Sequence, residues 1–61
     1  MNDNRSITAA DIDDMTRDAL IAWLTWNDPN GIYTDRDNEA EGYPPMTHTE
    51  LQLTALSQLE G

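Results

Sequence analysis

Residues 8–27, TAADIDDMTRDALIAWLTWN, decide the fold of this chain. Apolar residues recur here at the three- and four-residue spacing of an amphipathic helix, which predicts one helix over residues 8–27. Thr8 and Asp11 have the spacing of a capping pair, and Thr16 offers a second start, so a broken or late-starting helix is the alternative. The predicted apolar face consists of Ile12, Met15, Ala19, Ala22, Trp23 and Trp26, widened by Leu20 and Leu24.

A second helix is predicted over residues 47–60. Thr47 and Glu50 have the spacing of a capping box, in which the Thr47 hydroxyl accepts from the Glu50 amide while the Glu50 carboxylate reaches back. Met46 and Leu51 are placed as a hydrophobic staple across this start. The predicted buried stripe consists of Leu51, Ala55 and Leu59, with Leu56 beside them.

The connection, residues 28–46, is acidic and rich in turn-forming residues. Its start, DPNG at residues 28–31, predicts a type I turn that Gly31 closes with a positive φ. Thr34 as a cap and Gly42 as an exit predict one or two helical turns, followed by extended chain at residues 43–45, YPP. The chain is therefore predicted to be all-α, with a flexible N-terminus at residues 1–7 and a single helical domain over residues 8–61. Two architectures fit, a helical hairpin or a minimal three-helix unit.

The charge balance narrows the function classes. The 61 residues include twelve acids and three arginines, which gives a net charge of -9. Nucleic-acid binding depends on neutralising phosphates with Lys and Arg, so direct binding is not expected, and neither is docking on an anionic membrane. The balance favours a partner protein with a basic surface. A polar N-terminus with no long apolar run predicts a cytoplasmic location.

Neither catalysis nor a cofactor is predicted. The only histidine, His48, falls in the first turn of a helix, where an exposed position is expected, and so short a chain has no room to enclose an active site. The alternating acids of the connection have oxygen ligands that calcium prefers, but an EF-hand loop starting at Asp35 would place Ala40 where glycine is required. No metal site is predicted, although a loose cation site in the acidic connection remains an alternative to a solvated loop.

Acidic and apolar side chains together predict protein binding. Asp11, Asp14 and Asp18 are expected to form a carboxylate row along one helix, which could occupy a groove that another protein evolved for phosphates. The alternative is an ordinary solvated helix face. Apolar anchors are expected beside the acids, with Trp26 in the core and Trp23 either in the core or exposed. The predicted partner-binding residues are Asp11, Asp14, Asp18, Ile21, Trp23, Tyr33, Asp35, Asp37, Glu39 and Glu41.

The stretch WLTWNDPNGIYTD at residues 23–35, continued by EAEG at residues 39–42 and PMT at residues 45–47, resembles segments of short uncharacterised open reading frames of phages and prophages. The resemblance covers less than half of the chain and carries no functional residue with it. It implies a phage or mobile-element context, in which tiny acidic proteins often inhibit host machinery.

These observations predict a non-catalytic module that binds a larger host protein. The most specific form of the hypothesis is a phage-type inhibitor of host defence or of a nucleic-acid-handling complex, acting through an acidic surface that mimics nucleic acid. The alternative is a structural or regulatory module that forms a homodimer through the leucine face of its last helix.

Overall fold

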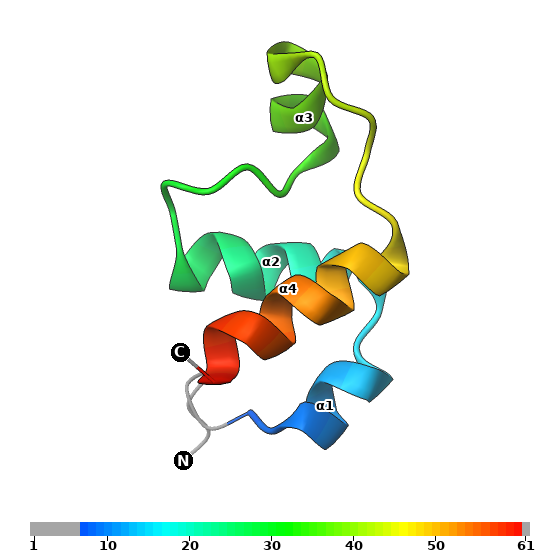
Figure 1. Ribbon diagram of the computed structural model, residues 1–61, viewed down its shortest axis with the longest axis vertical. Helices are drawn as coiled ribbons and strands as arrows, with labels where there is room; N and C mark the ends of the chain where they lie inside the picture. Colours follow the sequence, from blue (N-terminus) through cyan, green and yellow to red (C-terminus); the bar gives the residue numbers. More distant parts are fainter. Residues whose placement is uncertain (1–6, 61) are drawn as a thin grey trace.

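The computed structural model describes residues 7–60, which form four helices and no strand (Figure 1). They are α1 (Ala9–Asp14), α2 (Arg17–Asn27), α3 (Asp35–Glu41) and α4 (His48–Glu60). The all-α prediction is confirmed, and α1, α2 and α4 make a minimal three-helix unit to which α3 is added. The prediction of a flexible N-terminus falls mostly on residues 1–6, which lie outside the described residues.

The predicted continuous helix over residues 8–27 is wrong, because the chain breaks at Met15 and Thr16. Met15 ends α1 with an extended ψ of 140°, and Thr16 begins α2 as its N-cap, accepting a hydrogen bond from the Ala19 amide at 3.1 Å. Thr8 caps α1 in the same way, in the predicted box with Asp11. Two caps eight residues apart therefore start two helices, as the alternative allowed.

The connection is ordered by the caps that its sequence predicts. Thr34 accepts a hydrogen bond from the Asp37 amide at the start of α3, and Gly42 ends the helix in the left-handed region with φ of 82°. The buried side chain of Asn38 donates to the Thr34 carbonyl at 2.9 Å, which links the two ends of the first turn of α3. The prediction of one or two helical turns here is confirmed.

The predicted turn at residues 28–31 forms, but its glycine is required for a different reason. The Gly31 amide donates to the Asp28 carbonyl at 3.0 Å, as the turn requires. The φ of Gly31 is not positive, contrary to the prediction. The glycine is needed because a Cβ at this position would collide with the ring of Tyr33.

Helix α4 supplies the centre of the core. It starts with the predicted capping box, in which Glu50 accepts from the Thr47 amide at 2.8 Å and donates its own amide to the Thr47 hydroxyl at 3.1 Å. It packs against both α1 and α2, whereas α3 stands apart from these three helices (Figure 1). The buried apolar residues are Ile12, Leu20, Trp23, Leu24, Tyr33, Leu51 and Ala55.

The predicted stripe of α4 is confirmed at its centre and looser at its end. Leu51 and Ala55 are fully buried, while Leu56 and Leu59 are partly buried and pack against the core. Met46 packs against the same cluster, in agreement with its place in the predicted staple. In residues 7–60 there is no helix with the length and apolar character that a membrane span requires.

Candidate functional site

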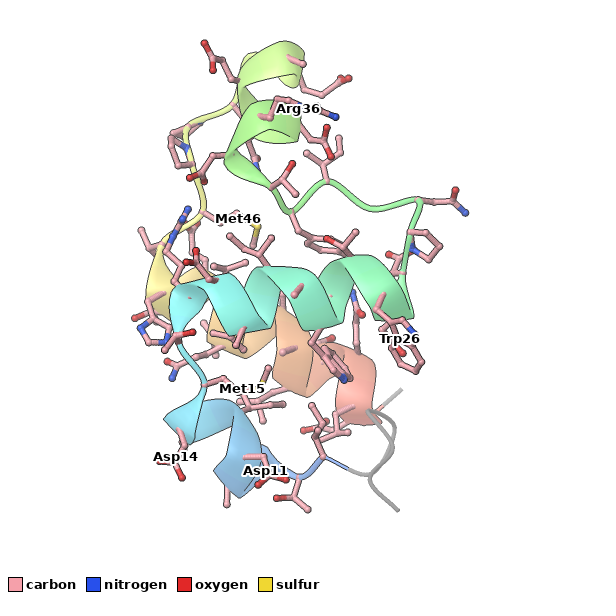
Figure 2. The ribbon with its side chains drawn as sticks, turned by 180° about the vertical axis from the view of Figure 1, so that it is seen from behind. Asp11, Asp14, Met15, Trp26, Arg36 and Met46 are labelled. Atoms are coloured by element: carbon pink, nitrogen blue, oxygen red, sulfur yellow. The ribbon has the colours of Figure 1, made fainter. Side chains whose placement is uncertain are left out.

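An open apolar groove runs between α1 and the first half of α2. Its volume is about 380 Å³, and its lining residues are Ile7, Asp11, Met15, Ala19, Ala22 and Trp23. We call this hollow the α1–α2 groove. Two of its lining residues, Asp11 of α1 and Met15 at the end of α1, are labelled in Figure 2.

The groove follows from the break in the first helical segment and from two small side chains. Because the chain turns at Met15 and Thr16, α1 and α2 are separate helices that both pack mainly against α4. Ala19 and Ala22 lie one turn apart on the side of α2 that faces α1, and their methyl groups are too short to fill the space. A hollow remains where larger residues would have closed the core.

The two tryptophans differ in exposure. Trp23 is 6% exposed and belongs to the core, one of the two environments expected for it, where it forms one wall of the groove. Trp26, which was predicted to be core, is 49% exposed. It follows Ala22 by four residues and Trp23 by three, so it continues the groove-facing side of α2. The α2 strip, Ala19, Ala22, Trp23 and Trp26, is therefore a continuous apolar surface.

Asp11 supplies the polar atom of the groove. Its Oδ2 accepts hydrogen bonds from the Thr8 amide at 2.8 Å and from the Thr8 hydroxyl at 3.2 Å, which stabilises the start of α1. Neither of these two hydrogen bonds uses Oδ1. The cap thus holds one carboxylate oxygen at the edge of an apolar hollow, where a cation could bind it.

The predicted carboxylate row is interrupted. Asp11 and Asp14 lie on α1 and Asp18 lies on α2, so the three do not follow one helix as expected. All three are exposed, and so is Asp13, which the sequence analysis did not include among the binding residues. The structure therefore has exposed acids around the α1–α2 corner but not the straight row that a single helix would have made.

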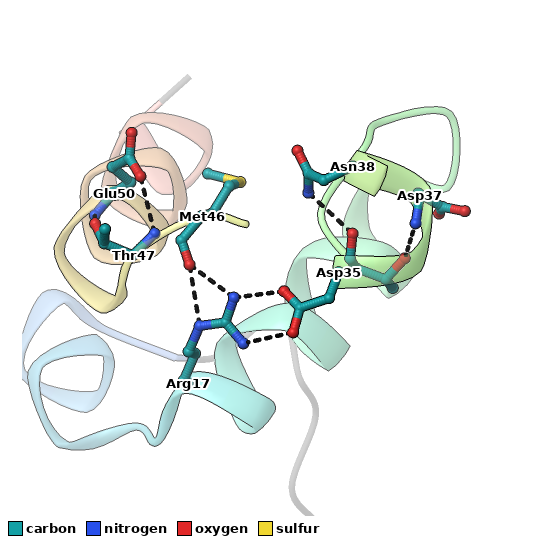
Figure 3. Close-up of polar contacts among 8 residues, drawn as sticks. Arg17, Asp35, Asp37, Asn38, Met46, Thr47 and Glu50 are labelled. Carbon is teal, nitrogen blue, oxygen red and sulfur yellow. Dashed lines mark hydrogen bonds and ion pairs between the residues drawn. The ribbon is translucent and has the colours of Figure 1, made fainter. Parts of the chain in front are cut away.

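Of the four connection acids predicted to bind a partner, one forms an ion pair with an arginine. Asp35 receives two hydrogen bonds from Arg17, at 3.1 Å from Nη1 and 2.5 Å from Nη2 (Figure 3). The hydrogen bond from the guanidinium lowers the pKa of the Asp35 carboxyl and raises the pKa of Arg17. Asp37, Glu39 and Glu41 are on α3, away from the groove.

Arg17 joins the starts of three helices. Besides its two bonds to Asp35, it donates from Nε and Nη2 to the Met46 carbonyl, at 3.0 and 2.7 Å (Figure 3). Arg17 begins α2, Asp35 begins α3, and Met46 precedes the cap of α4. Asp35, predicted to meet a partner, is therefore held in an ion pair within the chain, although its side chain is 56% exposed.

Tyr33 is buried and Ile21 is half-buried. The Tyr33 ring is 7% exposed, and its hydroxyl donates to Asp28 Oδ2 at 2.7 Å and accepts from Gln58 Nε2 at 2.6 Å. Burial raises the pKa of this hydroxyl, and the hydrogen bond to Asp28 raises it further. Ile21, expected to project among acids, is half-buried and packs against the core. Neither residue is an exposed anchor.

The one histidine has a structural contact. His48 is exposed, as predicted, and its Nε2 lies 3.0 Å from the Met15 carbonyl oxygen, which the break between α1 and α2 leaves unpaired within the helix. Because a carbonyl oxygen only accepts, Nε2 carries the proton of this bond. Within residues 7–60 no three His, Asp or Glu side chains converge in a way that could hold a metal ion.

Sequence reasoning assigned the groove residues to a buried face and so missed the groove. The signal was present in Ala19 and Ala22, because two alanines one turn apart cannot fill a core face that also carries two tryptophans. No protein family, curated protein or solved structure matches this chain. The resemblance to phage open reading frames stays a prediction.

Proposed function

We propose that this protein is a non-catalytic binding module that docks on a basic surface of a larger protein. The observation that carries the proposal is the apolar α2 strip, half-exposed at Trp26, beside the exposed acids of the α1–α2 corner. A tryptophan is the residue most enriched among the anchors of protein interfaces, and exposed apolar surface rimmed by charge is typical of them.

Electrostatics support a basic partner. The net charge is -9, and of the described cations Arg17 is engaged with Asp35 while Arg36 lies on α3. A surface of this charge attracts a cationic protein over a distance of about a Debye length, roughly 8 Å at physiological salt. Its approach to nucleic acid or to an anionic membrane is correspondingly unfavourable.

The most specific form of the proposal is a cytoplasmic inhibitor of phage or mobile-element origin, directed at a host defence or nucleic-acid-handling protein. The resemblance of residues 23–35 supports this context, and the acidic surface supports competition with nucleic acid for a basic groove. The interrupted row of Asp11, Asp14 and Asp18 means that the mimicry rests on overall charge and not on a phosphate-like spacing.

Homodimerisation through the leucine face of α4 finds less support. Leu51 and Ala55 are fully buried against α1 and α2, so the face that was expected to dimerise is already covered. Leu53, 61% exposed, is the large apolar side chain that α4 leaves outside, and one such residue is ordinary on a protein surface.

The proposal is tested by immobilising the full chain and passing a bacterial lysate over it at low salt. We expect proteins with basic surfaces to be retained, to elute as salt rises, and to be displaced by duplex DNA. The control is a chain of the same composition in scrambled order, which keeps the charge and loses the folded surface. Equal retention by the two chains, or none by either, contradicts the proposal.

A further inference from the structure

The α1–α2 groove and the adjoining Trp26 form one apolar surface with a defined direction. The groove is lined on one side by Ile7 and Met15 and on the other by Ala19, Ala22 and Trp23. Along α2 the strip continues past the groove to Trp26, a total of two helical turns from Ala19. An extended apolar trough of this kind fits the side of another helix better than it fits a compact molecule.

The chemistry of the lining points the same way. A small-molecule site is usually enclosed and has several converging polar groups, whereas this groove is open and has one carboxylate, Asp11. Partner recognition by strand addition needs an exposed sheet edge, and residues 7–60 contain no strand. Of the other modes of peptide recognition, an amphipathic helix that lays its apolar face in the groove fits an open apolar trough between two helices best.

The charge around the groove favours positively charged residues beside the apolar face of that helix. Asp14 and Asp18 are exposed near it, and Asp11, also exposed, uses Oδ2 and not Oδ1 for its hydrogen bonds to Thr8. Figure 2 shows Asp11, Asp14 and Trp26 in the part of the molecule around α1 and α2, with Arg36 at the far end on α3. A helix with Lys or Arg beside its apolar residues is complementary to this surface, and an acidic helix is not.

We propose that the α1–α2 groove and Trp26 bind a basic amphipathic helix of a partner protein, with its apolar side chains in the groove and a Lys or Arg on Asp11 Oδ1. The inference rests on the proposed binding function and specifies its partner and its site. It makes Trp26 the principal anchor and assigns α3, with its own exposed acids, no direct part in this contact.

The test uses three synthetic helical peptides as probes against the full chain. The first has leucines at helical positions i, i+3, i+4 and i+7 and lysines elsewhere; the second replaces its lysines by glutamine; the third replaces its leucines by serine. We expect the leucine–lysine peptide to bind best, with losses of at least about tenfold for each of the other two. Chemical shifts of backbone amides should change along α1 and α2 and remain unchanged in α3.

Two lysine substitutions locate the contact. Ala22→Lys puts a long cationic side chain into the groove, and Ala40→Lys makes the same change at an exposed position of α3. We expect A22K to weaken the leucine–lysine peptide at least about tenfold and A40K to weaken it less than about twofold. Trp26→Ala is the second variant for this contact, because half of the Trp26 side chain is exposed and its removal should disturb the fold little. Circular dichroism checks that each variant folds.

Each outcome decides between the groove and the wider function. The groove proposal is overturned if A22K binds the leucine–lysine peptide as tightly as the unchanged chain does. It is also overturned if the unchanged chain binds the serine–lysine and leucine–lysine peptides equally. Stronger loss in A40K than in A22K moves the contact to α3, which overturns the groove and leaves the acidic binding function standing. If no peptide binds while the lysate proteins are still retained, the groove fails alone; if both are absent, the proposed function fails with it.

Discussion

At the scale of single residues, a tyrosine hydroxyl connects two distant parts of the chain. Tyr33 follows the turn after α2, and its hydroxyl lies between Asp28 of that turn and Gln58 of α4. Its ring packs over Gly31, which is why that position has no side chain. The residue that looked like an exposed anchor therefore ties the start of the connection to α4.

We predict that Tyr33→Phe lowers the free energy of unfolding by about 1–3 kcal/mol, because the ring stays buried while Asp28 and Gln58 lose their shared partner. Urea denaturation followed by circular dichroism measures the change. Tyr43→Phe is the matched control, since Tyr43 is 57% exposed and the same atom is removed. A loss in Y43F as large as that in Y33F would show that the hydroxyl network is not responsible.

The same variant has a pH signature. The folded-state pKa of Tyr33 is raised above the ordinary tyrosine value of 10.0, so the unfolded chain releases this proton at a lower pH than the folded chain. The contribution of the Tyr33 hydroxyl to the free energy of unfolding is therefore fully present below pH 10.0. It decreases as the pH rises through the folded-state pKa. Y33F should lack that alkaline component of the unfolding free energy, while Y43F retains it.

At the scale of elements, the caps decide more than the apolar pattern does. Thr8, Thr16, Thr34 and Thr47 each accept a hydrogen bond from the backbone amide three residues on, and each starts a helix. Thr16 has the largest consequence, because it separates α1 from α2 and so opens the α1–α2 groove.

We predict that Thr16→Ala destabilises the protein by about 0.5–2 kcal/mol, the usual range for loss of an N-cap. The matched control is Thr25→Ala, the same substitution at an exposed position inside α2, where the change should be close to neutral. Thermal unfolding measures both. Equal effects at the two positions would mean that the break does not depend on the Thr16 hydroxyl.

The caps also explain which parts of the structure could be predicted. Cap chemistry is local, so the starts of α1, α3 and α4 and the exit at Gly42 follow from residues only a few positions apart. The orientation of α2 is not local. Once the helix is broken, Leu20 and Leu24 turn towards the core, and Trp26 lies about 200° around the helix from Leu24. A continuous helix would have kept the orientation expected from α1, and that is why Trp26 was predicted to be buried.

The candidate functional site could be predicted from the sequence only in part, for a similar reason. The abundance of exposed acids follows from composition, and Glu39, Glu41 and the three aspartates of the α1–α2 corner are exposed as expected. The pairing of Asp35 with Arg17 spans 18 residues and depends on how α3 is brought back to the start of α2. The groove depends on the angle between two helices, which no local pattern encodes.

At the scale of the whole molecule, uncompensated charge opposes the fold. The net charge is -9, and Arg17–Asp35 is the ion pair that residues 7–60 form. The molecule is 37 Å long and 20 Å across, so acids on neighbouring helices lie within reach of one another when salt is dilute. At about 10 mM salt the screening length is about 30 Å, which exceeds the width of the molecule.

We predict that the melting temperature rises as sodium chloride increases from about 10 mM to about 0.5 M. Added salt should screen the repulsion among the many acids more than it weakens the Arg17–Asp35 ion pair.

Asp14→Asn is the informative variant. Asp14 is exposed at the C-terminal end of α1, where a negative charge also opposes the helix dipole. D14N should melt at a higher temperature than the unchanged chain in dilute salt, and the difference should shrink as salt is added. Peptide binding at the α1–α2 groove should weaken over the same range, so folding and binding respond to salt in opposite directions. A melting temperature that falls with added salt would instead mean that attractive pairs dominate the charge interactions of the folded chain.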